Sequence, residues 1–417
     1  MMSKEKRRVP KLRFPGFTED WEQRKLDELV DVLDGDRGKN YPKAVDFEVQ
    51  GHTLFLSASN VTNEGFSFKN NQYITKEKSD SMGNGRLVED DVIITSRGSL
   101  GHVAWYNREI QRSMPHVRIN SGMLILRKKV DISMSYLQQF IKSYKGQSQI
   151  SFISFGSAQP QLTKKDVQKI NIIYPVNLNE QIKIETYFSK LDDLITLHQR
   201  KLDNLKVKKK ALLQKLFPKN GERYPELRFP GFTDAWEQRK FSDLYEKISE
   251  KNDLSYSLDK IISVANMYYK SDAKVSNEEY LKTYNIFRYG EIAFEGNKSK
   301  DFAYGRFVEN TIGDGIISHV FEVFRPIGQY DICFWKYYIN YEPIMRKVLS
   351  RCTKKTTMMT NLVAKDFLKE TVLVPPLAEQ KQIGTLLNAL DKSLTLHQRK
   401  LDHLQLQKKA LLQQMFV

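Results

Sequence analysis

Residues Glu180–Phe217 read EQIKIETYFSKLDDLITLHQRKLDNLKVKKKALLQKLF, and a second copy, EQKQIGTLLNALDKSLTLHQRKLDHLQLQKKALLQQMF, spans Glu379–Phe416 at a constant offset of 199. Apolar residues in the first copy recur at spacings close to a heptad repeat, interrupted near His198 and Lys209. They are Ile184, Tyr187, Leu191, Leu194, Leu202, Leu205, Leu212 and Leu216. Each copy therefore predicts one helix of roughly forty residues, about 60 Å long.

A helix of this length with one apolar stripe needs a packing partner. We expect the two copies to pack on each other as a coiled coil, antiparallel because a whole domain separates them in the sequence. The alternative, that each helix lies on its own domain, agrees less well with a stripe that extends over the full length. His198 and its copy His397 occupy the stripe, where a polar residue that fixes the register is a better interpretation than a metal ligand.

A shorter repeat precedes each half of the chain. Leu12–Leu29 reads LRFPGFTEDWEQRKLDEL and Leu227–Leu244 reads LRFPGFTDAWEQRKFSDL, identical at thirteen of eighteen positions with an offset of 215. The segments that the repeats enclose, 30–177 and 245–376, do not resemble each other. Similar flanks around dissimilar domains predict one mechanical task shared by the flanks and a separate task for each domain. The alternative is a recent duplication whose inserts have drifted.

The repeats divide the chain into six segments. They are an N-terminal flank (1–29), a first domain (30–177), a central long helix (178–217), a second flank (218–244), a second domain (245–376) and a distal long helix (377–417). Strand-like runs in the first domain are Thr53–Leu56, Asp91–Ser96, His102–Trp105 and Met123–Leu126. In the second they are Ile261–Val264, Glu291–Glu295, Ile316–Ile317 and His319–Phe324, with helical stretches near Phe334–Leu349. The predicted fold class is α/β, with two mixed α/β domains, two long antiparallel helices and an internal pseudo-two-fold repeat.

The charge balance favours a polyanionic partner. Lysine and arginine number 66 against 50 aspartates and glutamates, a net charge of +16 that is spread along the chain. A nucleic-acid surface would therefore have to be assembled by folding, and an ordinary solvated basic surface is the alternative. With only Cys333 and Cys352, and no apolar run of membrane-spanning length, we expect neither a disulfide scaffold nor a membrane segment, and we expect a cytoplasmic location.

The sequence carries no catalytic motif that we can identify. Gly38–Lys39 lacks the preceding glycine of a phosphate-binding loop, and Val374–Pro375–Pro376–Leu377 lacks the amide and the aromatic ring that adenine methyltransferases use. No HExxH pair and no zinc-spaced Cys/His cluster occurs. We therefore predict a chain that catalyses nothing and binds no metal.

This layout resembles the specificity subunit of type I restriction-modification enzymes over essentially the whole chain. The residues that carry the resemblance are Gln161–Leu162 leading to Pro175 and Glu180–Gln181, and Asn361–Leu362 leading to Pro375 and Glu379–Gln380. The segments DDVIITSRGSLGHVAWYN (90–107) and YGEIAFEGNKSKDFAYGRF (289–307) are similar to the strand-rich centres of target recognition domains.

The resemblance implies that each recognition domain reads one half of a split double-stranded DNA sequence and that the paired helices fix the gap. It also implies docking of two methyltransferase subunits and of restriction and translocase subunits. S-adenosylmethionine, ATP and magnesium would belong to those partners, with no cofactor in this chain. Two other possibilities remain, a coiled-coil scaffold that never touches DNA and a self-sufficient DNA-modifying enzyme with an unrecognised site.

Base reading requires side chains that form paired hydrogen bonds, delivered by turns and strand ends. The candidates in the first domain are Lys76, Arg86, Ser96, Arg97, Ser99, Arg112 and His116. Those in the second are Asn297, Lys298, Lys300, Tyr304, Arg306, Ser318, His319, Arg351, Lys354 and Lys355. For each, a solvated side chain or a phosphate contact is the alternative. For the methyltransferase interface, the repeated aromatic residues of the flanks are the candidates, with burial against the helix ends as the alternative: Phe14, Phe17, Trp21, Phe229, Phe232 and Trp236.

Overall fold

The computed structural model describes residues 8–154, 160–219, 221–270, 277–355 and 359–416. The chain forms two compact units, the first made of residues 1–199 and 399–417 and the second of residues 200–398. The two long helices, α7 (Leu178–Leu216) and α11 (Leu377–Gln414), each contribute one half to either unit. No helix in the described ranges is long and apolar enough to cross a membrane.

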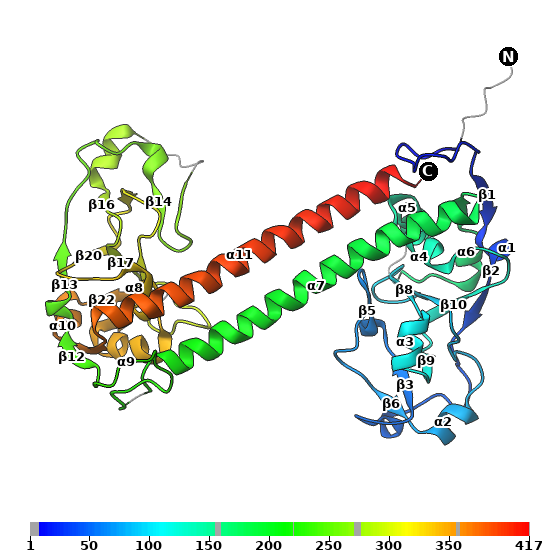
Figure 1. Ribbon diagram of the computed structural model, residues 1–417, viewed down its shortest axis with the longest axis horizontal. Coiled ribbons are helices and arrows are strands. Elements are labelled where there is room, and N and C mark those ends of the chain that lie inside the picture. The colour runs from blue at the N-terminus through cyan, green and yellow to red at the C-terminus, as the bar shows by residue number, and fades with distance from the viewer. Residues whose placement is uncertain (1–7, 155–159, 220, 271–276, 356–358, 417) are drawn as a thin grey trace, which may run out of the picture. The chain divides into compact units, whose positions relative to one another are not determined.

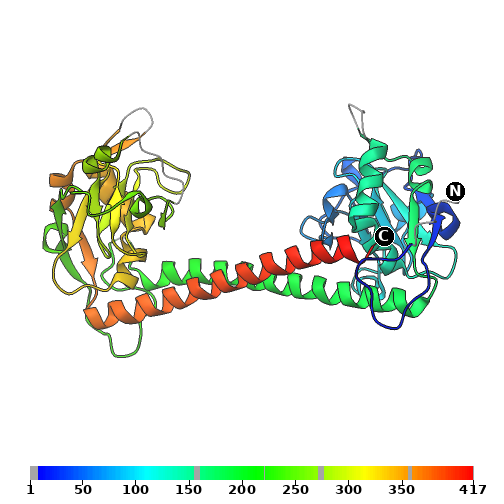
Figure 2. The ribbon, with the colours of Figure 1, turned by 90° about the horizontal axis from the view of Figure 1, so that it is seen from above.

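Within each unit α7 and α11 lie side by side and antiparallel (Figures 1 and 2). In the first unit Lys408 forms an ion pair with Asp192, and in the second Lys209 forms one with Asp391 at 2.6 Å. The two pairs are related by the offset of 199, and their residue numbers both sum to 600, as antiparallel pairing requires. The predicted antiparallel packing is therefore confirmed.

The predicted stripe was wrong at two positions. Phe188 and Ile195 are buried in the seam, whereas Tyr187 is half-buried beside it and Leu194 is 42% exposed. The correct seam alternates steps of four and three, as a heptad does.

With those two residues in place, the seam passes through His198 and Lys209 without a change of phase. The full series is Ile184, Phe188, Leu191, Ile195, His198, Leu202, Leu205, Lys209, Leu212 and Leu216. The apparent interruptions are polar residues at seam positions. His198 and its copy His397 are both half-buried there.

The first unit is built on a four-stranded antiparallel sheet, ordered β2 (Val30–Asp34), β10 (Met123–Lys128), β7 (Val92–Thr95) and β8 (Val103–Trp105). A second sheet is ordered β6 (Tyr73–Ile74), β3 (Thr53–Leu56) and β9 (Val117–Ile119). Short elements complete the domain: β4 (Val61–Thr62), β5 (Gly65–Phe66), α1 (Leu26–Leu29), α2 (Lys76–Ser81), α3 (Arg108–Ser113), α5 (Tyr144–Ser154) and α6 (Lys164–Gln168). All four strands expected in this domain are present within two residues of their predicted bounds.

The second unit repeats the four-stranded sheet as β13 (Tyr245–Ile248), β20 (Glu322–Pro326), β17 (Ile292–Glu295) and β18 (Arg306–Glu309). Its remaining strands pair in twos: β14 (Ile262–Ser263) with β15 (Tyr268–Tyr269), β16 (Asn285–Phe287) with β19 (Gly315–Ile317), and β21 (Thr353–Lys355) with β22 (Thr360–Leu362). The expected helical region is two helices, α8 (Ile332–Tyr338) and α9 (Glu342–Cys352), because Pro343 starts a new helix. The strand predicted from His319 begins only at Glu322, after a turn.

Each domain is closed onto its flank by a two-stranded sheet. Strand β1 (Glu22–Lys25) pairs with β11 (Asn171–Tyr174), and β12 (Glu237–Lys240) pairs in the same way with β23 (Thr371–Val374). The helices α4 (Met134–Lys142) and α8 lie in corresponding places, because the hydroxyls of Tyr136 and Tyr338 donate to carbonyls of β11 and β23. Helix α10 (Ala364–Lys369) precedes β23, as α6 precedes β11. The two units therefore share a frame and the order of the four-stranded sheet, and they differ in the smaller sheets.

Candidate functional site

In the first unit, three predicted DNA contacts meet on one surface. Lys76 begins α2, and Arg86 bonds the same carboxylate that Lys76 approaches, that of Asp80. His116 lies beside them, its ring stacked on that of His52 at 4.1 Å. The pKa of His116 is lowered by partial burial and by the neighbouring His52 and Arg86. The surface therefore presents exposed hydrogen-bond donors around a stacked pair of imidazole rings.

The other first-unit candidates lie apart from this group. Arg97 and Ser99 are exposed in the turn after β7, and Arg112 is exposed in the last turn of α3. Ser96 is only 1% exposed, so a direct contact from its side chain to a base is disfavoured. Arg97 and Arg112 have no acidic partner among the described residues, which leaves their guanidinium groups available.

In the second unit, the turn after β17 and the β21–β22 pair lie together, because Thr360 donates its backbone N–H to Gly296 and Asn297 bridges to Met359. This contact brings the exposed Asn297, Lys298, Lys300 and Lys354 onto one surface with the half-buried Tyr304. The side chain of Lys355 lies outside the described residues.

Two more arginines predicted to contact DNA are paired with a carboxylate of their own unit, as Arg86 is with Asp80. Arg306 donates to Glu295 at 2.7 Å and to the carbonyl of Ala265 at 2.7 Å, and it stacks over Phe302. Arg351 is paired with Glu370 at the edge of α9. Ser318 and His319 lie in the turn before β20, with His319 exposed. The partner carboxylates lie 11 and 19 residues away in the sequence, outside the spacing of any local motif, so the residue pattern did not mark these arginines as paired.

A polar surface that was not predicted from the sequence lies between β5 and β6. The residues Lys69, Asn70, Asn71 and Gln72 line one side of a shallow depression of about 640 Å³, with Gln50 opposite. Amide side chains pair with adenine and lysine with guanine, so this surface is of the chemical type that reads bases. Four consecutive side chains able to form hydrogen bonds were the available signal.

The predicted docking residues fall into two classes. Trp21 is 2% exposed and packs edge-on against Tyr136, and Trp236 is fully buried against Phe334 and Tyr338. The tryptophans therefore anchor each flank to its own unit, which is the alternative considered from the sequence.

The four phenylalanines remain half-exposed at the helix ends. Phe14 packs edge-on against Tyr187 of α7, and Lys183 lies 4.9 Å above the ring of Phe17. Phe229 and Phe232 occupy the repeated positions in the second unit. Part of each ring is accessible, so the phenylalanines stay candidates for a docking surface.

Each flank is held by a two-point ion pair to the start of a long helix. The Nε and Nη2 atoms of Arg13 lie 2.7 and 2.9 Å from the two carboxylate oxygens of Glu180, whose side chain is 1% exposed. Arg228 and Glu379 repeat this geometry at 2.9 and 2.7 Å. The neighbouring Gln181 and Gln380 donate to the carbonyls of Pro175 and Pro375. Arg13 and Glu180 were both visible in the repeats, but their spacing of 167 residues concealed the pairing.

The N-terminal flank also contacts the far end of the chain. The backbone N–H of Leu12 donates to the carbonyl of Gln414 at 3.0 Å, and that of Leu227 donates to Lys215 at 2.8 Å. These bonds occupy the same place in the two units. In the second unit the end of α7 continues directly into the flank that contains Leu227. In the first unit the end of α11 and the flank that contains Leu12 meet in the same way, although they lie at opposite ends of the sequence.

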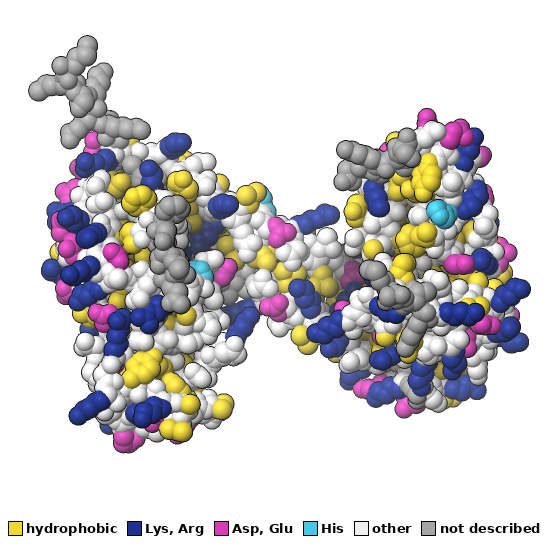
Figure 3. Space-filling model, turned by 180° about the vertical axis from the view of Figure 1, so that it is seen from behind, with side chains coloured by type: hydrophobic (Ala, Val, Ile, Leu, Met, Phe, Trp, Pro, Cys, Tyr) yellow, Lys and Arg dark blue, Asp and Glu magenta, His cyan; other side chains and the backbone are white. Residues whose placement is uncertain are grey.

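Basic side chains are spread over both units with acidic ones between them (Figure 3). Among the described side chains, no three histidine, cysteine, aspartate or glutamate residues come together as ligands of a metal ion.

Comparisons with known proteins agree with this geometry. A family described as type I restriction modification DNA specificity domain matches residues 18–207 and again residues 233–406. The putative type I restriction enzyme MjaX specificity subunit of Methanocaldococcus jannaschii is 25% identical over 209 residues, 48% of this chain and 46% of that protein. The chain thus matches about half the length of this curated relative.

Solved structures extend the likeness to the whole fold. The crystal structure of the type I restriction-modification S subunit from M. genitalium has a TM-score of 0.65 at 15% identity, covering 98% of this chain and 99% of that one. A structure from work on complex assembly and conformational transition of the type I restriction-modification system has a TM-score of 0.50 at 15% identity, covering 95% and 97%. At 15% identity the solved structures show a shared fold, and the match to the family shows which family the chain belongs to. The chain belongs to the type I restriction-modification DNA specificity family and carries the domain of that family twice.

Proposed function

We propose that this chain is the DNA-recognition subunit of a type I restriction-modification complex and that each of its domains reads one half of a bipartite double-stranded target. The observation that carries the proposal is the repeated frame with two different domains. The ion pairs Arg13–Glu180 and Arg228–Glu379 repeat, as does the order of the four-stranded sheet, while the smaller sheets and the sequences of the two domains differ. A frame used twice with different inserts suits a protein that reads two different sequences.

The reading surfaces that we propose are the exposed donor groups of each domain. In the first domain they are Arg97, Arg112, the group of Lys76, Arg86 and His116, and the amide-rich segment 69–72. In the second they are Asn297, Lys298, Lys300 and Lys354. Arginine and lysine suit guanine, and asparagine and glutamine suit adenine, whereas the remaining basic residues would contact phosphates.

We assign the gap between the half-sites to the long helices, because α7 and α11 are the segments that belong to both units. Their seam is continuous over ten positions in α7, which suits a stiff spacer. Lengthening this seam should therefore lengthen the gap.

The docking surface for two methyltransferase subunits would combine the half-exposed phenylalanines with apolar residues on the outer face of the helices. Leu197 and its copy Leu396 are 45% and 66% exposed, and Val207 and its copy Leu406 are 71% and 68% exposed. Exposed apolar side chains at repeated positions favour a partner bound twice. Methylation, ATP hydrolysis and cleavage would then belong to partner subunits in the cytoplasm, which would hold S-adenosylmethionine, ATP and magnesium.

The experiment that tests this function is methylome sequencing of cells with and without the chain. We expect a bipartite methylated motif that disappears on deletion and returns when the chain is expressed again. A purified chain, free of partners, should show no methyltransferase or nuclease turnover. Methylation that is unaffected by deletion, or turnover by the chain alone, would contradict the proposal.

A further inference from the structure

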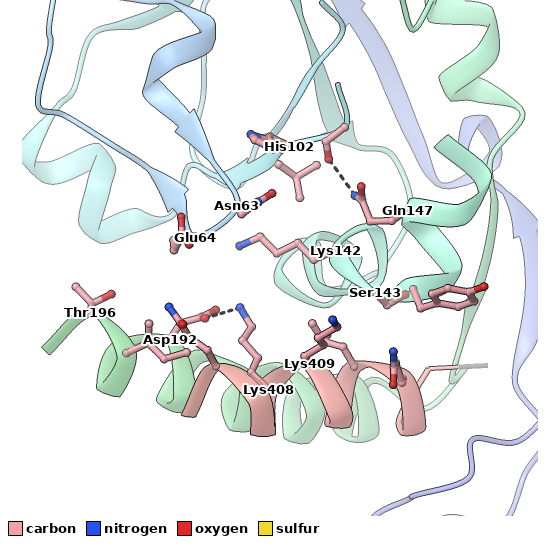
Figure 4. A pocket seen from close by; sticks show the side chains of 17 residues that line it. Asn63, Glu64, His102, Lys142, Ser143, Gln147, Asp192, Thr196, Lys408 and Lys409 are labelled. Atoms are coloured by element: carbon pink, nitrogen blue, oxygen red, sulfur yellow. Dashed lines mark hydrogen bonds and ion pairs between the residues drawn. The ribbon is translucent and has the colours of Figure 1, made fainter. Parts of the chain in front are cut away.

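The first unit contains a cavity between the recognition domain and the ends of the two long helices (Figure 4). It has a volume of about 530 Å³. Asn63, Glu64 and His102 border it on the side of the domain, and Asp192, Lys408 and Lys409 on the side of α7 and α11. Val103, Ile195 and Leu412 supply an apolar part of the wall. The cavity is thus both large enough and chemically mixed enough to hold a small organic group.

Lys142, the last residue of α4, extends across this cavity towards Asn63 and Glu64 (Figure 4). Its Nζ atom is buried and has no hydrogen-bond partner among the described residues, although part of its alkyl chain is exposed. Burial and the nearby Lys408 lower the pKa of this amine to about 8. A buried ammonium without a hydrogen-bond partner is unfavourable, so a bound anion within hydrogen-bond distance would stabilise it.

The carboxylate of Asp192, on the helix side of the cavity, already has two partners. One oxygen of Asp192 accepts from Lys408, and the other accepts from Gln139 at 3.2 Å. Lys409, on the next position of α11, has no acidic partner among the described residues. Three lysines thus face two carboxylates, those of Asp192 and Glu64, and the cavity keeps an excess of positive charge.

The corresponding place in the second unit differs because the lysines around its carboxylate are all paired. Asp391 accepts from Lys209 at 2.6 Å and from the hydroxyl of Tyr337 at 2.6 Å, and Lys336 lies 3.9 Å away. The ring of Tyr337 lies 5.0 Å from Lys209 and 5.4 Å from Lys336. Every one of these basic groups has a partner, so the shared frame does not require an unpaired lysine. The buried, unpartnered ammonium of Lys142 is what distinguishes the first unit from these paired lysines.

We propose that this cavity is a phosphate-binding site, in which Lys142 and Lys409 contact the phosphate oxygens and the apolar wall contacts the carbon skeleton that carries them. Lysine is a common point-charge ligand of phosphate, and the amides of Asn63 and Gln405 can add hydrogen bonds. The phosphate could come from a free nucleotide or from the DNA backbone, and the DNA source rests on the proposed function.

The test is calorimetric titration of the purified full chain with inorganic phosphate at constant ionic strength and pH 7. Lys142→Met should weaken phosphate binding at least tenfold, and Lys409→Gln should weaken it several-fold. Lys210→Gln is the matched control, since Lys210 is the copy of Lys409 at the offset of 199, and it should leave binding unchanged. Lys409 is exposed, so its replacement keeps the test valid if Lys142→Met fails to fold.

Two further titrations identify the source of the phosphate. Adenosine monophosphate that binds more tightly than phosphate, with unchanged DNA affinity in Lys409→Gln, would identify a free nucleotide. A reduction of about one in the log-log salt slope of DNA binding in Lys409→Gln would identify the backbone. Phosphate binding that is absent in the wild type, or equal in all variants, would overturn the site, whatever the result for DNA binding.

Discussion

Replacing Arg13 by methionine should destabilise the first unit severely. Arg13 makes two charge-assisted hydrogen bonds to Glu180, a carboxylate that is almost fully buried. The side chain of Glu180 has no other partner in the hydrogen bonds described, so the variant leaves a buried charge uncompensated. Breaking a buried pair by removing one partner costs about 3–5 kcal/mol, a large share of the roughly 5–15 kcal/mol that stabilises a typical domain.

The assay is urea unfolding of the full chain, followed by hydrogen exchange of peptides from each unit. Arg13→Met should increase exchange in the flank around Trp21 and in residues 178–199, and leave residues 245–376 unchanged. Arg228→Met is the matched variant and should have the reverse pattern, because it removes the same contact to Glu379.

The double variant Arg13→Met with Glu180→Met separates the buried charge from the lost contact. With both charges removed, the loss should be smaller than in Arg13→Met alone, since no unpaired carboxylate remains. A decrease of less than about 1 kcal/mol in the free energy of unfolding of Arg13→Met would refute the role of the buried charge. A double variant at least as unstable as the single one would refute it as well.

Three other outcomes are expected. Lys142→Met should stabilise the chain at pH 7 by up to about 3 kcal/mol, because folding lowers the pKa of the wild-type amine from 10.5 to about 8 and so penalises its charged form. In thermal melts the gain should fade between pH 8 and 10.5, where the wild-type amine loses its charge in the folded state. Glu309→Gln should change stability by less than about 1 kcal/mol in urea titrations at pH 7, since burial raises the pKa of this carboxyl well above its usual range and so favours the neutral form that glutamine resembles. Four residues inserted after Leu205, with four after Leu394 opposite, should lengthen both helices by about 6 Å and the methylated gap by one or two base pairs; an active complex with the original gap would refute the role of the helices.

The repeats made much of the frame predictable. A heptad stripe over the whole of each copy was enough to predict two long helices and their antiparallel packing. The error at Tyr187 and Leu194 arose because positions one residue apart are both apolar in this helix, and only packing shows that Phe188 and Ile195 face the partner. Lys209 looked like a break in the stripe because it is charged. Its partner Asp391, which allows a charged residue at this seam position, lies 182 residues away in the sequence.

The binding surfaces were less predictable, because availability depends on distant partners. Arg306 and Arg97 look alike in the sequence, yet Arg306 is held by Glu295 and Arg97 is not held by any described carboxylate. Trp21 looked like a docking residue because it repeats, and it repeats because both units need the same buried anchor. The bond between Leu12 and Gln414 joins the two ends of the chain, which no local pattern could indicate.

The central claim is that each domain reads one half of the target independently of the other. Its most direct test is to replace residues 30–177 by the first domain of another family member, keeping both flanks and helices, and to sequence the methylome. One half of the bipartite motif should change while the other half and the gap stay the same. A motif in which both halves change, or in which neither changes although the complex is active, would contradict it.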